Sequence, residues 1–133
     1  MTDSVLLERI QIRDAAPRLA GVVRRTPLER FECGDQRVEL CCKLECLQET
    51  GSFKARGAWN QVSQLSTAER RAGVVTTSSG NHGKALAWAA ERAGVRATIV
   101  MPADAYPNKI QACREHGAEV VLGKSRREAD ELC

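Results

Sequence analysis

The regular pattern of the second half of the chain limits the fold more than any other feature of the sequence. Short apolar runs at 73–76, 97–101 and 118–122 alternate with segments of helical character at 84–94 and 107–116. Such alternation over short connections is typical of an α/β unit, in which a parallel sheet is flanked by helices. Right-handed crossovers then bring the carboxyl ends of the strands to one edge, where ligands bind in sheets of this kind.

The remaining segments of the chain are less regular. Apolar spacing predicts a helix from Ser4 to about Leu19, a strand at 38–44 and a helix at 55–65. The letters S-T-A-E at 66–69 have the spacing of a capping box, in which a serine and a glutamate satisfy each other's backbone donors at a helix start. Residues 125–133 look like the start of another helix that stops without a cap or a partner strand, which suggests a fragment.

A run of small and polar residues, T-S-S-G-N-H-G at 77–83, follows the first strand of the regular unit. A loop between a buried strand and a helix directs backbone N–H groups and the positive end of the helix dipole outward, which suits a carboxylate or a phosphate. Gly80 and Gly83 would let such a ligand approach the backbone closely. The alternative is an ordinary capped turn with Ser78 or Ser79 as the N-cap. The run fits neither the phosphate-loop nor the dinucleotide-binding pattern.

Lys54 is the second candidate for chemistry and lies within T-G-S-F-K-A-R-G at 50–57. Because a lysine amine in water has a pKa of about 10.4, a nucleophilic lysine needs desolvation or a neighbouring cation. Phe53 and the apolar residues around it would supply the first, and Arg56 the second. The alternative is a surface lysine that follows a turn. Taken alone, neither Lys54 nor His82 separates a catalytic role from a structural one.

Composition and charge argue against several classes of protein. The net charge is only +3, and each basic pair has an acidic residue nearby, so no basic stripe supports nucleic-acid binding. No apolar run near the N-terminus is long enough for a signal peptide or a membrane span, so we expect a cytoplasmic protein. The six cysteines are then expected to be thiols. Without a C-x-x-C pattern, and with both histidines distant in sequence, no metal site is expected.

The two candidate stretches belong to an ordered set of motifs that spans about Arg25 to Leu122. The motifs are R-T-P-L (25–28), K-L-E (43–45), T-G-S-F-K-A-R-G-A (50–58), T-S-S-G-N-H-G (77–83) and A-T-I-V-M-P (97–102). Together they resemble the serine/threonine dehydratase and serine racemase group of pyridoxal-phosphate enzymes. That group has the tryptophan-synthase-β fold, also called fold type II, which agrees with the expected α/β class.

The resemblance implies a role for each candidate residue. Lys54 would form the Schiff base with pyridoxal 5'-phosphate and later take the α-proton, and Phe53 would pack beside the cofactor ring. Asn81 would hydrogen-bond the hydroxyl oxygen of that ring. The loop that receives the substrate carboxylate would consist of Ser78, Ser79, Gly80, Asn81 and His82. This assignment agrees with the anion site expected from the loop itself.

The reaction implied by the resemblance is the conversion of L-threonine or L-serine to a 2-oxo acid and ammonia, with the cofactor as electron sink. Ser79 keeps serine racemase as an alternative. In racemase-like members a serine here lies on the opposite face of the cofactor from the lysine, whereas threonine dehydratases usually carry alanine. A third hypothesis is a non-catalytic α/β fragment that binds an anion.

The resemblance also implies a division into domains and an incomplete enzyme. Residues 1–66 would be the N-terminal part of the large cofactor domain and carry Lys54, and residues 73–133 a truncated small α/β domain. Family members are more than twice this length, and their glycine-rich phosphate loop lies beyond the position of Cys133. We therefore expect this chain alone to bind the cofactor weakly and to turn over little or nothing. The full-length form is expected to be a homo-oligomer.

Overall fold

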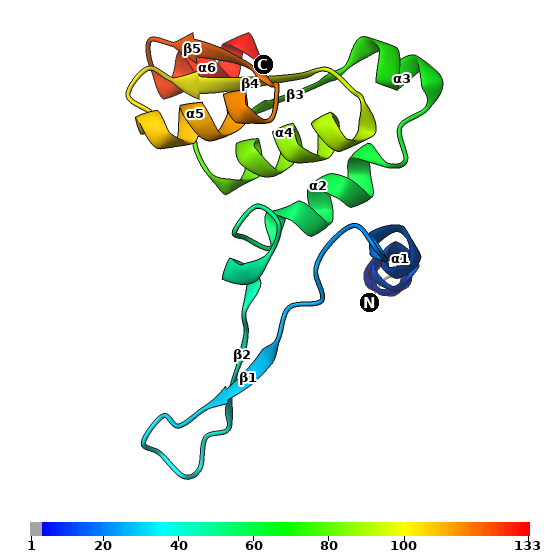
Figure 1. Ribbon diagram of the computed structural model, residues 1–133, viewed down its shortest axis with the longest axis vertical. Helices are drawn as coiled ribbons and strands as arrows, with labels where there is room; N and C mark the ends of the chain where they lie inside the picture. The colour runs from blue at the N-terminus through cyan, green and yellow to red at the C-terminus, as the bar shows by residue number, and fades with distance from the viewer. Residues whose placement is uncertain (1–3) are drawn as a thin grey trace.

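The computed structural model describes the backbone of residues 4–133 and the side chains of residues 12–125 and 127–133 (Figure 1). The helices in chain order are α1 (Ser4–Leu19), the 3-10 helix η1 (Glu45–Leu47), α2 (Lys54–Val62), α3 (Thr67–Ala72), α4 (Asn81–Ala93), α5 (Pro107–Glu115) and α6 (Arg126–Leu132). The strands are β1 (Leu28–Phe31), β2 (Leu40–Lys43), β3 (Val74–Thr77), β4 (Ala97–Pro102) and β5 (Glu119–Gly123).

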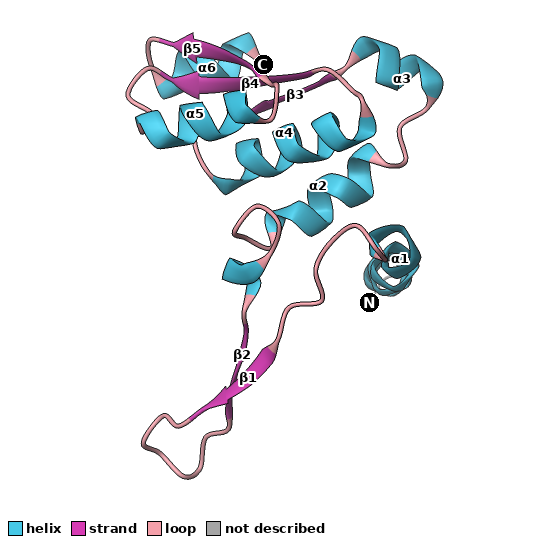
Figure 2. Cartoon of the chain, viewed as in Figure 1, coloured by secondary structure: helices cyan, strands magenta, loops and turns pink. Residues whose placement is uncertain are grey.

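The α/β unit has the expected parallel sheet flanked by helices, with strand order β3-β4-β5 (Figure 2). Helices α4 and α5 lie along one side of this sheet. Ile99 and Met101 of β4 are fully buried on the side shared with α4. Val100 alternates to the other side, where α6 packs against β4 and β5, and it is buried there.

The first strand of the unit is less buried than we expected for residues 73–76. It covers Val74–Thr77, and Val75 is half exposed. The strand order explains the difference, because β3 forms one edge of the sheet among the described residues. Val75 pairs with Thr98 on the face of α6, and α6 packs mainly against β4 and β5.

Small side chains let α2 and α4 approach closely in one core. The buried alanines of the two helices are Ala55, Ala58, Ala85, Ala87, Ala89 and Ala90. Trp59 and Trp88 meet beside them, with ring centroids 6.2 Å apart. The indole N–H of Trp59 donates to the backbone oxygen of Arg18 at 2.9 Å, so α1 is joined to α2 as well. The division of the chain between residues 66 and 73 into two domains remains a prediction.

The predicted start of α3 is confirmed, and that of α4 is wrong. Ser66 and Glu69 form both hydrogen bonds of a capping box. Helix α4 begins at Asn81, three residues before the expected start at Lys84, with Gly80 as its N-cap. The N–H of Gly83 finds an acceptor in the hydroxyl of Ser78, at 3.0 Å, which allows the helix to start early.

The hairpin formed by β1 and β2 projects away from the rest of the molecule (Figure 1). Leu28 pairs with Lys43 and Phe31 with Leu40 in antiparallel register. Every residue of β1 is exposed, and Cys42 is the one partly buried residue of β2. The hairpin therefore has almost no buried side chains of its own.

None of the helices within residues 4–133 combines the length and apolar character needed to cross a bilayer. No cluster of three metal-ligating side chains occurs in the part of the chain that the structure describes.

Candidate functional site

Lys54 is the first residue of α2 and follows a tight turn. Gly51 adopts a positive φ of 75° in this turn, a conformation that favours glycine. Thr50 and Ser52 are buried on either side of it, and their hydroxyl groups have no hydrogen-bond partner among the described residues. Phe53 is the N-cap and offers no side-chain acceptor to the helix. The lysine thus stands at a helix start that has backbone acceptors in Ser52 and Phe53 but no side-chain cap.

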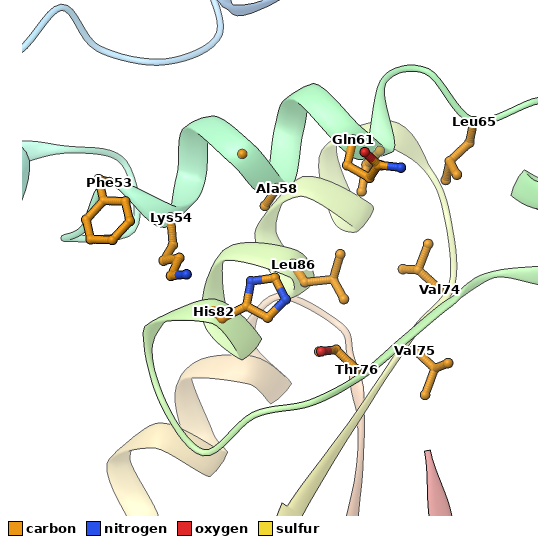
Figure 3. Close-up of a pocket in the computed structure, with 12 residues that line it drawn as sticks. Phe53, Lys54, Ala58, Gln61, Leu65, Val74, Val75, Thr76, His82 and Leu86 are labelled. Atoms are coloured by element: carbon orange, nitrogen blue, oxygen red, sulfur yellow. The ribbon is translucent and has the colours of Figure 1, made fainter. Parts of the chain in front are cut away.

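A pocket of about 410 Å³ lies between α2, β3 and α4 (Figure 3). Lys54 and His82 point into it from α2 and α4, with Phe53 beside the lysine. The far part is mainly apolar and includes Leu65 and Leu86. The packing of α2 against α4 thus brings together two residues that are 28 positions apart in the sequence.

The charges in this pocket favour a neutral His82. Desolvation of the imidazole, and then the positive charge of Lys54, hold the pKa of His82 below its usual value of 6.5. The histidine is therefore neutral at pH 7 and has one ring nitrogen able to accept a proton.

The two sources of lysine activation expected from the sequence are not found within the described residues. Lys54 is exposed, and its Nζ atom lies 5.3 Å from the centroid of the Phe53 ring, which is itself 59% exposed. The guanidinium of Arg56 is directed to the carboxylate of Glu45 and is not a free cation beside the lysine.

The loop before α4 keeps some of its backbone donors free. The hydroxyl of Ser78 accepts hydrogen bonds from the N–H groups of Gly80 and Gly83, at 3.3 and 3.0 Å. A serine thus satisfies part of the helix start, as the capped-turn alternative expected, although the N-cap is Gly80. The N–H groups of Asn81 and His82 have no acceptor among the described residues, so an anion placed there would meet two donors and the helix dipole.

Gly83 is required where α4 meets the sheet. A Cβ atom at this position would lie 2.9 Å from the backbone oxygen of Ser78 and 3.0 Å from Cγ2 of Ile99. Glycine therefore lets the helix start lie directly against β4. From the sequence we expected Gly83 to let a ligand approach the backbone. In the structure, the lack of a side chain at Gly83 instead allows α4 to pack against β4.

The remaining predicted residues lie at the carboxyl edge of the sheet. Ser78, Ser79 and Gly80 line a separate hollow of about 300 Å³, beside Asp130 of α6, and do not line the pocket of Lys54. The side-chain oxygen of Asn81 accepts a hydrogen bond from Nζ of Lys109 at 3.2 Å. The structure thus brings together Lys54, Phe53 and His82, and it places the serines around a neighbouring hollow.

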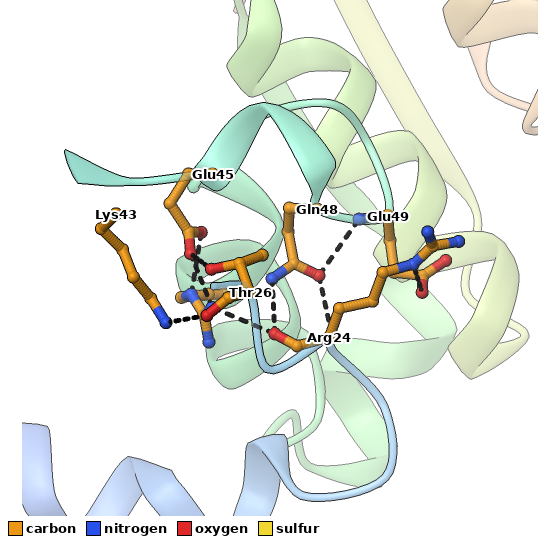
Figure 4. Close-up of polar contacts among 7 residues, drawn as sticks. Arg24, Thr26, Lys43, Glu45, Gln48 and Glu49 are labelled. Atoms are coloured by element: carbon orange, nitrogen blue, oxygen red, sulfur yellow. Dashed lines mark hydrogen bonds and ion pairs between the residues drawn. The ribbon is translucent and has the colours of Figure 1, made fainter. Parts of the chain in front are cut away.

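A polar network beneath the turn of Lys54 was not predicted from the sequence (Figure 4). Arg56 donates to both carboxylate oxygens of Glu45, at 2.9 and 2.7 Å, and the hydroxyl of Thr26 donates to the same carboxylate at 2.5 Å. The Arg56 guanidinium, together with the Thr26 hydroxyl, lowers the pKa of Glu45 from 4.5 to about 2. The sequence signal for this network was the opposite charge of Glu45 and Arg56 in two neighbouring motifs. Thr26 gave no such signal, because it is 19 residues away from Glu45.

Gln48 ties the same network to the backbone. Its side chain donates to the backbone oxygen of Arg24 at 2.9 Å and accepts from the N–H of Arg24 at 2.8 Å. Nη2 of Arg56 also donates to that oxygen, at 3.1 Å. Gln48 and Thr26 are both 4% exposed. Two buried polar side chains thus fix residues 24–26 against the turn that precedes Lys54.

Comparison with known proteins identifies relatives across most of the chain. The family described as pyridoxal-phosphate dependent enzyme matches residues 19–133. An L-threo-3-hydroxyaspartate ammonia-lyase from Pseudomonas is 49% identical over 81% of this chain and 34% of its own length. An L-threonine ammonia-lyase from Thermotoga maritima is 45% identical over 84% of this chain and 28% of its own.

The solved structures give the same result for the fold. The structure of maize serine racemase superposes with a TM-score of 0.83, at 36% identity, over 92% of this chain and 39% of the racemase chain. The chain thus spans about a third of the length of the curated relatives it matches.

Proposed function

Since this chain belongs to the pyridoxal-phosphate dependent enzyme family, we propose that it is part of an ammonia-lyase that converts L-threonine or L-serine to a 2-oxo acid and ammonia. Two of the relatives described above are ammonia-lyases, which supports this reaction class. The observation that carries the proposal for the site is the pocket between α2 and α4. The amine of Lys54 and the imidazole of His82, whose pKa is lowered, both line this pocket.

The residues present fit the reactive end of pyridoxal phosphate. The amine of Lys54 is exposed and forms no hydrogen bond or ion pair within the described part of the chain, so an aldehyde can reach it. The side-chain oxygen of Asn81 is already held by Lys109, which leaves its NH₂ group to donate to an oxygen of a ligand. The free N–H groups at the start of α4 suit a carboxylate.

When bound, pyridoxal phosphate supplies an electron sink for a carbanion at the α-carbon of the substrate. In this proposal Lys54 holds the cofactor, and its Nζ atom takes the proton from the α-carbon. His82, neutral at pH 7, is able to accept a proton beside it. The loop of Ser78–His82 binds the substrate carboxylate and so orients the α-carbon.

A second candidate function is serine racemase. It is favoured by the hydroxyl of Ser79, a second acid–base group within the loop, and by the likeness to the maize racemase. Racemisation needs a proton donor opposite the lysine, and Ser79 lies in a different hollow from Lys54. That position makes Ser79 the residue that discriminates between the two reactions.

The first test is where pyridoxal phosphate attaches. The chain would be incubated with pyridoxal phosphate, reduced with borohydride, and digested to measure the label on each lysine. We expect Lys54 to be labelled in preference to Lys43, Lys84, Lys109 and Lys124. An even distribution of label would contradict the assignment of Lys54.

Turnover by the full-length form, which this chain alone is not expected to sustain, then separates the reactions. With L-threonine or L-serine, 2-oxo acid and ammonia support the lyase, and D-serine from L-serine supports the racemase. Lys54→Ala should abolish both activities, with Lys84→Ala as the matched control. Ser79→Ala should suppress racemisation and spare elimination, and equal losses in both would show that Ser79 only shapes the loop. Preferential labelling of Lys54 without any turnover by the full-length form would favour a non-catalytic binding role.

A further inference from the structure

We propose that Glu45 and Arg56 are positioning residues, whose ion pair holds the first turn of α2 and thereby directs the amine of Lys54 into its pocket. This inference rests on the proposed function, since it assigns the pair a role toward the cofactor lysine. Neither residue lines the pocket, so both act through the backbone that carries Lys54.

The residues at the start of α2 do not favour a helix N-terminus at this position. A helix N-terminus carries a partial positive charge and is stabilised by acidic residues. The first turn of α2 contains no acidic residue and has Lys54 and Arg56 instead. The N-cap, Phe53, gives no side-chain hydrogen bond, and the N–H groups of Ala55 and Arg56 bond only to the backbone oxygens of Ser52 and Phe53, at 3.4 and 3.1 Å. Backbone bonds alone hold this turn locally, so side-chain interactions from outside the helix add to the order at Lys54.

Glu45 supplies the missing negative charge. Its carboxylate receives two hydrogen bonds from the planar guanidinium of Arg56, the geometry that fixes both groups most strongly. The side chains are only 16% and 30% exposed, so water weakens this pair less than an ion pair on the open surface. A third bond, from the hydroxyl of Thr26, holds the carboxylate in place.

Both ends of the lysine turn are attached to the same short segment. Before the turn, the side chain of Gln48 accepts a hydrogen bond from the N–H of Arg24 and donates one to the backbone oxygen of Arg24. After the turn, Arg56 reaches the same Arg24 oxygen and, through Glu45, also Thr26. Between these two attachments, the hydroxyls of Thr50 and Ser52 have no partners among the described residues. The turn is held only by backbone hydrogen bonds such as Gly51 N–H to the oxygen of Gln48, at 2.8 Å. The contacts of Gln48, Arg56 and Glu45 with residues 24–26, called the clamp below, therefore fix the direction of Lys54 together with these bonds.

The experiment measures the selectivity of labelling under conditions where each variant is folded, because a change in reagent or overall labelling rate cancels in such a ratio. Pyridoxal phosphate with borohydride serves as the probe, and label on Lys54 is divided by label on Lys84 and Lys124. In Glu45→Gln and Arg56→Met we expect this ratio to fall about tenfold, the scale of one coupled pair. The control is Glu39→Gln, which removes an exposed carboxylate paired with Arg30 in the hairpin and should leave the ratio unchanged.

Rescue and coupling test whether the pair acts as a unit. Arg56→Lys keeps a cation and should restore part of the ratio, although a lysine cannot make the two-pronged contact. The double variant of Glu45→Gln and Arg56→Met should be no worse than either single variant. Additive losses, or an unchanged ratio in both single variants, would overturn the proposal.

A second measurement keeps the inference testable where labelling fails. If the unaltered chain shows no preference for Lys54, the proposed function fails, and hydrogen exchange then examines the clamp alone. Glu45→Gln should increase amide exchange at residues 50–58 and leave β4 protected. Unchanged exchange at 50–58, or an equal increase throughout the molecule, would contradict the clamp.

Discussion

The strands β4 and β1 differ in how their side chains are covered. In β4, Ile99, Val100 and Met101 are at most 1% exposed, whereas in β1 Leu28 is 65% and Phe31 is 47% exposed. Strand β4 lies between two strands and is covered by helices on both faces. The hairpin has one ladder and no covering element among the described residues. A two-stranded hairpin of this kind is at best marginally stable by itself.

The comparison shows that the two regions are held by different interactions. Burial of apolar side chains and alanine packing stabilise the α/β unit. The base of the hairpin is fixed by polar groups, in which Lys43 donates to the backbone oxygen of Thr26 at 2.6 Å and Leu44 to that of Pro27 at 3.0 Å. The clamp at Glu45 joins the hairpin to the helix that carries Lys54. Substitutions should therefore act very differently in the two regions.

The largest effect is expected from truncation of a core side chain. Ile99→Ala removes a fully buried side chain and should lower the free energy of unfolding by about 3–4 kcal/mol. The matched change in the hairpin, Leu28→Ala, should cost less than about 0.5 kcal/mol because the side chain is already exposed. Urea unfolding followed by the fluorescence of Trp59 and Trp88 measures both. A cost above about 1 kcal/mol for Leu28→Ala would show that the hairpin has a cover of its own.

The next effect concerns the contact between α4 and the sheet. Gly83→Ala places a methyl group against the backbone of Ser78 and against Ile99, and should destabilise the fold by about 2 kcal/mol. The control is Gly57→Ala in α2, where the new methyl group meets nothing within 4 Å. That variant should be stabilising by about 0.5–1 kcal/mol, because alanine favours the helix. Thermal unfolding of the two variants gives opposite shifts of Tm if this packing is correct.

The clamp should make stability depend on acid pH through Glu45. Its pKa is lowered from 4.5 to about 2 in the folded state, so its contribution is complete above pH 4.5 and is lost as the pH falls toward 2. At pH 6 Glu45→Gln should cost about 2 kcal/mol, the scale of a hydrogen-bonded charge pair. The difference between the unaltered chain and this variant should shrink steadily from pH 4.5 downward. A difference that stays constant to pH 3 would contradict the ion pair.

The smallest effects are expected from the cap of α3 and then from an exposed ion pair of the hairpin. Ser66→Ala removes the side-chain acceptor of the capping box and should cost about 1 kcal/mol. In the hairpin, Glu39→Gln breaks an ion pair whose side chains are 74% and 63% exposed, and should change stability by less than about 0.5 kcal/mol. The denaturant midpoint should therefore fall more for Ser66→Ala than for Glu39→Gln, and an equal fall would contradict the difference between a capped helix and an exposed ion pair.

The elements with strong periodic patterns could be predicted from the sequence. The strand after Val95, the helix from Pro107 and the capping box at Ser66 were found as expected, because each depends on neighbouring residues. The start of α4 was misplaced because the acceptor for the N–H of Gly83 lies outside the helix. The exposure of β3 depends on strand order, which local pattern does not determine.

The residues of the candidate site could be predicted from the sequence, but their arrangement in space could not. Lys54 and His82 share a pocket only because alanines let α2 and α4 pack closely. Ser79 lies in a different hollow, which Pro102 of β4 and Asp130 of α6 help to line, and local sequence does not place α6 there. The clamp of Glu45 and Arg56 joins motifs whose charges are visible in the sequence, but its third member, Thr26, comes from a separate segment.

The burial of one cysteine makes thiol modification a measure of how often the α/β unit opens. Cys113 of α5 is fully buried in the core and its burial raises the pKa of the thiol, whereas the other cysteines are exposed or partly exposed. A thiol reagent must therefore modify the other cysteines at once and reach Cys113 only in molecules whose α5 has separated from the sheet. The lag between the two modifications measures how often Cys113 becomes accessible, through opening at α5 or through unfolding of the whole chain.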